Sequence, residues 1–212
     1  MFVRDFMTRE LISARTDYLA GATLQRMRDE GLRRMPVLDT GGKLTGMISD
    51  RRLLQALAVP TRRGEFRRSV AKPPSLTVGD LMNPNVVTTS PDVPLEEAAT
   101  MMVFNRIGSV VVMEEGQAVG IITETDMFRI FLRLLGGEER GLRVTLRAPA
   151  FRGIQADILT DIARAGGHLV SLGNLTDDES VLMAFKVLDL TAEDLEAILA
   201  ELPVDDLDIR DA

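Results

Sequence analysis

Leu44-Thr-Gly-Met-Ile-Ser-Asp50 and Val119-Gly-Ile-Ile-Thr-Glu-Thr-Asp126 are two versions of one motif, and they decide how this 212-residue chain folds. Each version runs from apolar residues and a glycine to a hydroxyl residue and then to an acid. A short apolar run indicates a buried strand, and a hydroxyl residue followed by acids is typical of a helix start. The motif therefore predicts a strand that leads directly into a helix, twice in the chain.

The repetition extends well beyond the motif itself. Residues 7–57 align with residues 82–131 at an offset of 75, which falls to 74 after one deletion. With that deletion, Ser49 is matched with Thr123. Self-similarity at a fixed spacing is the signature of a supersecondary unit that is used more than once. We therefore expect two copies of one unit.

The spacing of apolar residues changes in the same order in both copies. A short β-prone run precedes apolar residues at helical spacing, and two strands joined by a turn then lead into a second amphipathic helix. Pro94 suits the first turn of a helix, where its missing N–H costs nothing. The order predicted for each copy is β-α-β-β-α. The expected elements are Leu11–Ala14, Leu19–Glu30, Met35–Leu38, Leu44–Ser49 and Asp50–Ala58 in the first copy, and Asn85–Thr89, a helix opened by Pro94, Ser109–Met113, Ala118–Thr123 and Glu124–Leu135 in the second.

The segment that follows has a different order of elements. Gly166-Gly167 is expected to end its first helix, and Thr191 with Asp194 three residues later predicts a capping box at its second helix. The predicted order, β-α-β-β-α-β, is the ferredoxin-like pattern. The expected elements are Leu142–Ala148, Ile154–Ala165, His168–Leu172, Val181–Leu188, Ala192–Leu202 and Val204–Ile209.

The order, the spacing and the repeated motif resemble CBS domains. The resemblance implies that residues 1–75, a first repeat with a basic linker, pack through their sheet against residues 76–137, a second repeat. In many members of this family the clefts between two such repeats hold AMP, ATP, S-adenosylmethionine or related ligands. The predicted fold class is therefore α+β, with the two repeats packed as a pair and a separate domain after them.

Residues 142–212 resemble an ACT domain, notably in Gly166-Gly-His-Leu-Val-Ser-Leu172. Many ACT domains have Pro-Gly where the first strand turns into the helix, and this chain has Arg152-Gly153 there. The glycine is retained and the proline is not, which leaves amino-acid binding by this domain open. The order of a CBS pair and then an ACT-like domain resembles the acetoin utilization proteins of the AcuB family.

Gly120-Ile-Ile-Thr-Glu-Thr-Asp126 matches the nucleotide motif of the CBS family. Free N–H groups at a helix start favour a phosphate, Thr123 can donate its hydroxyl to it, and Asp126 can accept from both hydroxyls of a ribose. Thr-x-x-Asp is also an ordinary helix cap that needs no ligand. Thr77-Val-Gly-Asp80 has the same spacing and is interpreted as a cap only.

The first copy departs from this motif, because Arg52 takes the place of the ribose-binding Asp. An arginine accepts no hydrogen bonds, so ribose binding of that kind is lost. One interpretation is a solvated arginine, and the other is that Arg51 or Arg52 contacts the phosphates of a nucleotide held by the second copy. The resemblance implies that the first strand and the loop before the second strand enclose the adenine. The candidate ligand-binding residues are Val87, Thr88, Ile107, Gly108, Ser109, Gly120, Ile122, Thr123, Asp126, Arg51 and Arg52.

Several classes of chemistry find no support in the sequence. The chain has no cysteine, which excludes disulfides and thiolate sites, and its one histidine, His168, is interpreted as structural. It has no phosphate-binding loop, no His-x-x-x-His metal pair and no nucleophile elbow. No apolar run reaches the roughly 18 to 20 residues of a membrane span. We expect a cytoplasmic protein that is not an enzyme and has no metal.

Charge is distributed unevenly along the chain. Residues 1–75 carry fifteen Lys and Arg against eight Asp and Glu, a net charge of +7, whereas residues 76–139 carry a net charge of −7. The sequence predicts a regulatory protein that senses an adenine nucleotide (AMP, ADP or ATP) or S-adenosylmethionine. The ACT-like domain would add a second small ligand. The alternatives are an interaction subunit that docks on a partner enzyme or transporter without binding a ligand, and a nucleic-acid binder that uses the basic first third.

A homodimer through the CBS pair is also expected. Opposite net charges on the two repeats favour an antiparallel arrangement, in which the first repeat faces the partner's second repeat. Apolar contacts between the helices of the repeats are the competing contribution, which would override this electrostatic preference and would use residues such as Leu53, Leu57, Phe128 and Phe131.

Overall fold

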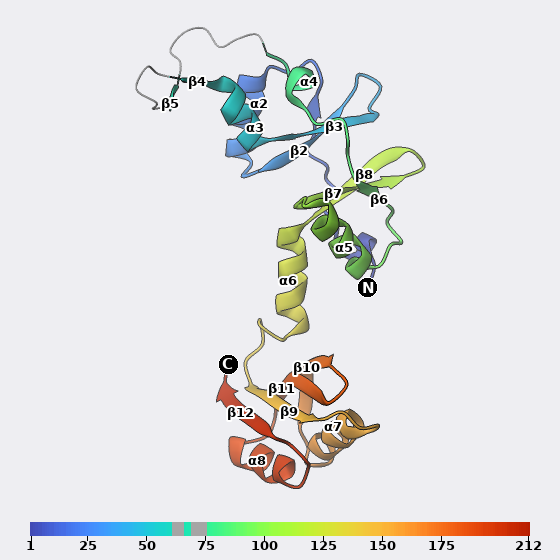
Figure 1. The fold of residues 1–212 in the computed structure, drawn as a ribbon, viewed down its shortest axis with the longest axis vertical. Coiled ribbons are helices and arrows are strands. Elements are labelled where there is room, and N and C mark those ends of the chain that lie inside the picture. The colour runs from blue at the N-terminus through green and yellow to red at the C-terminus, as the bar shows by residue number, and fades with distance from the viewer. Residues whose placement is uncertain (61–65, 69–75) are drawn as a thin grey trace. The chain divides into compact units, whose positions relative to one another are not determined.

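The computed structural model describes residues 1–60, 66–68 and 76–212. These residues form two compact units, Met1–Met127 and Phe128–Ala212, which Figure 1 shows as ribbons. Helix α6, Glu124–Leu134, begins in the first unit and ends in the second. The basic linker expected near residue 75 lies largely outside the described residues. Among the residues that are described, no helix combines the length and the apolar character needed to cross a bilayer.

Each copy of the repeat forms a three-stranded sheet, with strand orders β1-β2-β3 and β6-β7-β8. In both sheets the first pair of strands is parallel and the second is antiparallel. The β-α-β-β-α order expected for each copy is present, although the first strands are shorter than expected and a one-turn helix precedes each copy. The elements are α1 Val3–Phe6, β1 Ala14–Arg15, α2 Ala20–Asp29, β2 Arg34–Leu38, β3 Leu44–Ser49, α3 Asp50–Leu57, the hairpin strands β4 Ala58–Pro60 and β5 Phe66–Arg68, α4 Val78–Leu81, β6 Thr88–Thr89, α5 Leu95–Asn105, β7 Ser109–Glu114, β8 Gln117–Thr123 and α6.

The register of the two hairpins reproduces the alignment of the two copies. Arg34 lies opposite Ser49 in β2–β3, and Ser109 lies opposite Thr123 in β7–β8. These pairs are related by the offsets of 75 and 74, and both hairpins have a register irregularity at the equivalent point. The single deletion therefore falls in the turn between the two strands, where a change in length disturbs no core contact.

The segment before each copy pairs with the other copy. Thr8 exchanges two backbone hydrogen bonds with Ile121, at 2.9 and 3.0 Å between N and O, and Asn83 does the same with Met47, at 2.8 and 2.9 Å. The two bridges are equivalent under the repeat alignment, so the exchange is symmetric. Each repeat is thus completed by a segment that precedes its partner in the chain.

The glycines of the two motifs lie where these exchanged segments cross the sheets. A Cβ added to Gly120 would lie 2.8 Å from the carbonyl oxygen of Thr8. A Cβ added to Gly46 would lie 2.5 Å from Sδ of Met82 and 3.1 Å from the carbonyl oxygen of Asn83. Real Cβ atoms essentially never approach other atoms as closely as the first two of these distances. The close backbone approach explains both glycines without a ligand.

The interior of the first copy consists of apolar side chains from its strands, its two longer helices and the exchanged segment. Met27 of α2, Met35 of β2, Leu53 of α3 and Val78 of the exchanged segment are fully buried there. The expected contribution of Leu53 to a dimer interface is therefore wrong, because its side chain faces its own core. The helical spacing around Leu53 predicts a helix with an apolar face. It does not show whether that face packs on the core of its own repeat or lies at the surface.

The second unit is a four-stranded antiparallel sheet in the order β10-β11-β9-β12. Helices α7 and α8 cover one face of it (Figure 1), where Phe185, Ile158, Ile162, Leu195 and Leu199 are buried together. The expected β-α-β-β-α-β order is present, and β10 is longer than expected. The elements are β9 Leu142–Pro149, α7 Ile154–Arg164, β10 His168–Thr176, β11 Ser180–Leu188, α8 Ala192–Ala200 and β12 Asp206–Asp211.

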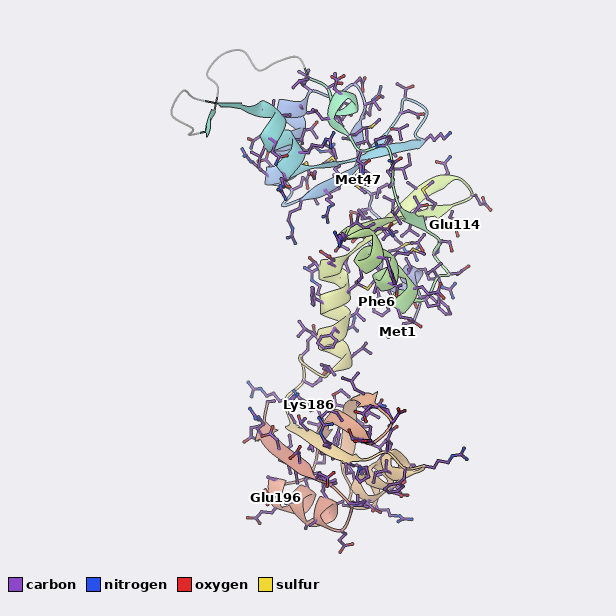
Figure 2. The ribbon with its side chains drawn as sticks, in the orientation of Figure 1. Met1, Phe6, Met47, Glu114, Lys186 and Glu196 are labelled. Atoms are coloured by element: carbon purple, nitrogen blue, oxygen red, sulfur yellow. The ribbon has the colours of Figure 1, made fainter. Side chains whose placement is uncertain are left out.

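The connector between α6 and β9 packs on this same sheet. Lys186, labelled in Figure 2, is 3% exposed and donates from Nζ to the backbone oxygen of Glu139 at 2.6 Å. Gly136 lies against Ser171 of β10, where an added Cβ would be 2.8 Å from the serine Oγ. Side chains alternate between the faces of a strand, so Lys186 points away from the helix-covered face that its neighbour Phe185 fills. The connector therefore covers part of the opposite face.

The capping box expected at α8 is present. Thr191 Oγ1 accepts from the backbone N–H of Asp194 at 3.1 Å, and the Asp194 carboxylate accepts from the backbone N–H of Thr191 at 2.9 Å. Loss of such a cap costs about 1 kcal/mol, so Thr191→Ala should lower the free energy of unfolding by about that amount. Thr176→Ala, an exposed threonine at the end of a strand, is the matched control and should have little effect in the same urea titration.

The pKa of the Asp194 carboxyl is held below its usual range by its hydrogen bonds with Thr191. A carboxyl with a lowered folded-state pKa stabilises the fold above its unfolded pKa, and the stabilisation is lost as the pH falls through the folded pKa. The gap between the parent protein and Thr191→Ala should therefore shrink on acidification. A gap that stays constant down to the acid transition would contradict this role of the carboxylate.

Candidate functional site

A cleft of about 240 Å³ lies within the first unit, between the two repeats. Met47, labelled in Figure 2, contributes from β3, and the rest of the lining comes from both copies. Its lining has an apolar part and a polar part, the latter made of arginine, asparagine and serine side chains. The lining residues are Arg34, Met47, Ser49, Arg52, Asn83, Asn85, Val86, Val87, Ile107 and Ser109.

The cleft joins the strand-to-helix junction of one copy to the strands of the other. Ser49 and Arg52 belong to the first junction, Ser49–Arg52, where β3 ends and α3 begins. Val87 and Ile107 belong to the second copy, immediately before β6 and β7. The exchange of segments brings these parts together, because Asn83 is bonded to Met47 of the first copy while the following residues lead into the second. The cleft is therefore built across the repeats.

Ser109 supplies an unused hydrogen-bonding group at the cleft. Its side chain is 6% exposed, and its Oγ has no hydrogen-bond partner in the described structure. Buried polar groups nearly always have a partner, and an exception needs an explanation. Thr23, Thr89 and Ser171 also have unpartnered buried hydroxyls among the described residues, and Ser109 is the one of the four that lines the cleft, where a ligand would supply the partner.

Two arginines give the polar part of the lining a positive charge. Neither the Arg34 nor the Arg52 side chain makes a hydrogen bond or ion pair with any residue in the described part of the chain. The Arg34 guanidinium and the Glu124 carboxylate both lie against Gly108. Oε2 of Glu124 would be 2.5 Å from a Cβ added to this glycine, so the two side chains occupy the space that a larger residue would need. The Arg52 backbone N–H donates to Ser49 Oγ at 3.3 Å, which places Arg52 in the first turn of α3. An anion would be attracted to this part of the lining.

The candidate residues named in the sequence analysis fall into two groups, those that line the cleft and those that lie outside its lining. Val87, Ile107 and Ser109 line the cleft together with Arg52. Gly108 adjoins it through Arg34, whereas Thr88 lies in β6 and Arg51 is exposed on α3 outside the lining. The second junction, Thr123–Asp126, lies outside this cleft, Gly120 lies against Thr8, and Ile122 is fully buried.

The second junction has the geometry of a helix cap. The Asp126 carboxylate accepts from the Thr123 hydroxyl at 2.7 Å and from the Thr123 N–H at 2.9 Å, and Thr123 Oγ1 accepts from the Asp126 N–H at 3.3 Å. The Thr77–Asp80 pair, interpreted as a cap only, has corresponding distances of 2.8, 2.8 and 3.3 Å. The two boxes do not differ by more than about 0.1 Å, so this geometry alone does not indicate a ligand.

Sequence reasoning missed six of the lining residues, namely Arg34, Met47, Ser49, Asn83, Asn85 and Val86. A signal for them was present in the repeat alignment. Because the copies are related by a pseudo-twofold exchange, the junction of one copy faces the strands of the other. Pairing the strand-to-helix junction of one copy with the strands of the other copy, rather than with its own strands, groups Arg52 with Val87 and Ile107.

Two regions of the chain, residues 3–59 and 78–133, match the family model described as CBS domain. They include more than half of the residues, so the chain belongs to the CBS-domain family. A CBS domain-containing protein of Dictyostelium discoideum is 26% identical over 136 residues, which are 64% of this chain and 94% of that protein. The inosine-5'-monophosphate dehydrogenase of Korarchaeum cryptofilum is 28% identical over 58% of this chain, but the chain covers only 23% of that enzyme.

Solved structures share the fold of the pair. A Vibrio cholerae protein described as an acetoin utilization protein (AcuB) is 27% identical with a TM-score of 0.54, and the match covers 65% of this chain and 95% of that one. CBSX2, solved in complex with AMP, is 26% identical with a TM-score of 0.51, over 62% of this chain and 96% of its own. The CBS pair of MJ0100, solved with 5'-methylthioadenosine and S-adenosyl-L-methionine, is 24% identical with a TM-score of 0.52 and supports the fold alone.

Proposed function

We propose that this chain is a regulatory ligand sensor, and that its cleft binds an adenine nucleotide (AMP, ADP or ATP) or an adenosyl compound such as S-adenosylmethionine. The observation that carries the proposal is the unpartnered Ser109 hydroxyl in a cleft that is lined by apolar side chains and two arginines. Such a mixture of a largely apolar surface and a few convergent polar groups is typical of small-molecule sites. The AMP complex of the similar protein CBSX2 supports the adenine assignment.

The chemistry of the lining suggests how the ligand would be oriented. Met47, Val87 and Ile107 present apolar surface against which a purine could stack, while Arg34 and Arg52 present guanidinium groups for phosphate. The ligand would regulate by binding one of two states of the protein more tightly than the other, since no other effect of binding shifts an equilibrium. Helix α6 begins at Glu124, and the side chains of Glu124 and of the cleft residue Arg34 both lie against Gly108. We therefore propose that α6 transmits the change between the two states of the protein.

Thr123 and Asp126 remain proposed contacts of a second ligand position, related to the cleft by the pseudo-twofold exchange. The retained carboxylate supports ribose binding there. The Thr123 hydroxyl would then exchange its present hydrogen bond with Asp126 for one with the ligand. The cap geometry described above is the competing interpretation.

We also propose that the second unit is an ACT-like domain with a ferredoxin-like fold. Its strand order β10-β11-β9-β12 and its two helices on one face support this assignment. The proposal extends to a second small ligand at this domain and to the domain order of AcuB proteins. Phe128 and Phe131, which are 69% and 56% exposed, support a homodimer that covers them.

A thermal-shift panel of AMP, ADP, ATP, S-adenosylmethionine and amino acids tests the proposal. An adenosine-containing ligand at about 100 times its dissociation constant should add roughly 2.7 kcal/mol to the free energy of unfolding, a melting shift of several degrees. Asp126→Ala should weaken any binding at the second position by about ten- to a hundredfold, whereas unchanged affinity at every ligand site would leave Asp126 as a cap only.

Other outcomes of the panel identify the alternatives. A protein that responds to no adenosine compound would be an interaction subunit that docks on a partner enzyme or transporter. Binding to an oligonucleotide that weakens steeply with salt would instead identify a nucleic-acid binder that uses the basic first third. Either result would overturn the sensor proposal.

A further inference from the structure

We infer that the cleft recognises the phosphate chain of its ligand rather than the ribose diol, so that it prefers nucleoside di- and triphosphates and accepts the deoxy forms equally well. The inference rests on the proposed function and names its ligand class. It follows from which polar groups line the cleft and which do not.

The lining offers only neutral acceptors, the asparagine and serine oxygens, and no carboxylate for a ribose diol among the described residues. No Asp or Glu is among the side chains that line the cleft in the described part of the chain. Two vicinal hydroxyls are held best by a carboxylate, which accepts from both at once. The equivalent position in the second copy is Asp126, and in the cleft it is Arg52, which can only donate. Removing the 2'-hydroxyl of a ligand should therefore cost little affinity.

The same lining is well supplied with donors for phosphate. Arg34 and Arg52 both reach the cleft and have no partner among the described residues, and a guanidinium matches the geometry of phosphate oxygens with two parallel N–H groups. Arg52 also stands in the first turn of α3, where the helix dipole disfavours a cation, so an anion beside it relieves that cost. Each added phosphate should therefore strengthen binding.

A sulfonium ligand should bind poorly for the same reason. S-adenosylmethionine has a positive sulfur in place of the 5'-oxygen that carries the first phosphate of a nucleotide, and two cationic side chains line the cleft. The expected order of affinity is ATP and dATP first, then ADP, AMP and adenosine, with S-adenosylmethionine last.

Isothermal titration of the full chain with ATP, dATP, AMP and adenosine measures this order. We expect ATP to bind at least about tenfold more tightly than AMP, since an added charge-assisted hydrogen bond changes affinity by about ten- to a hundredfold. We expect the dissociation constants of ATP and dATP to agree within about twofold. AMP that binds as tightly as ATP, or dATP that binds about tenfold more weakly than ATP, would overturn the inference while leaving the proposed sensor intact.

Variants of the cleft separate the two contributions. Arg52→Ala should weaken ATP by about tenfold or more and adenosine much less, while Arg28→Ala, an exposed helical arginine away from the cleft, is the matched control and should change neither. Arg52→Asp should reverse the preference, with weaker ATP binding and a new penalty for dATP. Equal losses of ATP and adenosine in Arg52→Ala would overturn the role of Arg52 in phosphate binding.

Gly108→Ala provides a second test that leaves Arg52 untouched. Its methyl group would meet the ends of the Arg34 and Glu124 side chains, which are flexible and can move without unfolding the protein. Displacing the Arg34 guanidinium should weaken ATP more than adenosine. Unchanged ATP binding in this variant would overturn the role of Arg34. Absence of binding by every adenosine compound in the parent protein would instead overturn the proposed function itself.

Discussion

Gly120→Ala is expected to destabilise the paired repeats by about 1–3 kcal/mol, the usual cost of adding atoms to a closely packed site. The added methyl would lie 2.8 Å from the carbonyl oxygen of Thr8, which is fixed by its hydrogen bond with Ile121. A backbone carbonyl cannot rotate away as a flexible side chain can, so the exchanged segment has to shift. Urea denaturation followed by circular dichroism measures the change.

Gly21→Ala is the matched control for this substitution. Gly21 lies in α2 with nothing within 4 Å of an added Cβ, so the same change should stabilise the protein by about 0.5–1 kcal/mol through the higher helix propensity of alanine. If Gly120→Ala proves as stable as the parent protein, the close crossing of the exchanged segment is not what requires a glycine there.

Phe185→Ala should have a larger effect, about 3–5 kcal/mol, because it removes a fully buried aromatic side chain from the core of the second unit. The side chain packs with those of Ile158, Leu195 and their neighbours under both helices. A small domain has only about 5–15 kcal/mol of total stability, so this loss is a large fraction of it. Calorimetry should show the transition of the second unit shifted to much lower temperature.

Phe104→Ala removes the same side chain from an exposed position. Phe104 is 83% exposed on α5, and surface substitutions of this kind usually change stability by no more than about 0.5 kcal/mol. Comparable destabilisation by both variants would contradict the assignment of Phe185 to a core. A selective loss in Phe185→Ala, with ATP binding retained at low temperature, would also show that the cleft does not depend on the second unit.

The elements of this fold were predictable because their signals are local. The alternation of β3 and β8, the capping pair Thr191 and Asp194 and the offset between the copies are all properties of short stretches, and the structure has them at the expected residues. The one-turn helix α1 was not predicted, whereas the cap expected at Thr77 and Asp80 is present at the start of α4. A four-residue helix has too few residues to show a period, and its stability comes from packing against the other repeat.

The candidate cleft was harder to predict because it depends on which copy faces which. The sequence identified Val87, Ile107 and Ser109 as candidates and assigned them to a ligand held by Asp126. It left Arg52 as either a solvated arginine or a phosphate contact of that same ligand. Whether a junction faces its own strands or those of its partner is decided by the exchange of segments, which leaves no local trace. The Leu53 error has the same origin, since burial against the rest of the fold is not visible in a helical period.

The exchange of segments also determines the order in which this chain can fold. Thr8 is synthesised more than a hundred residues before its hydrogen-bonding partner Ile121. The first repeat can be completed once Asn83 has emerged from the ribosome, whereas the sheet of the second repeat closes on Thr8 across more than a hundred residues, and contacts of such high sequence separation slow folding. A truncation that removes the segment around Thr8 would accordingly destabilise the second repeat rather than the first.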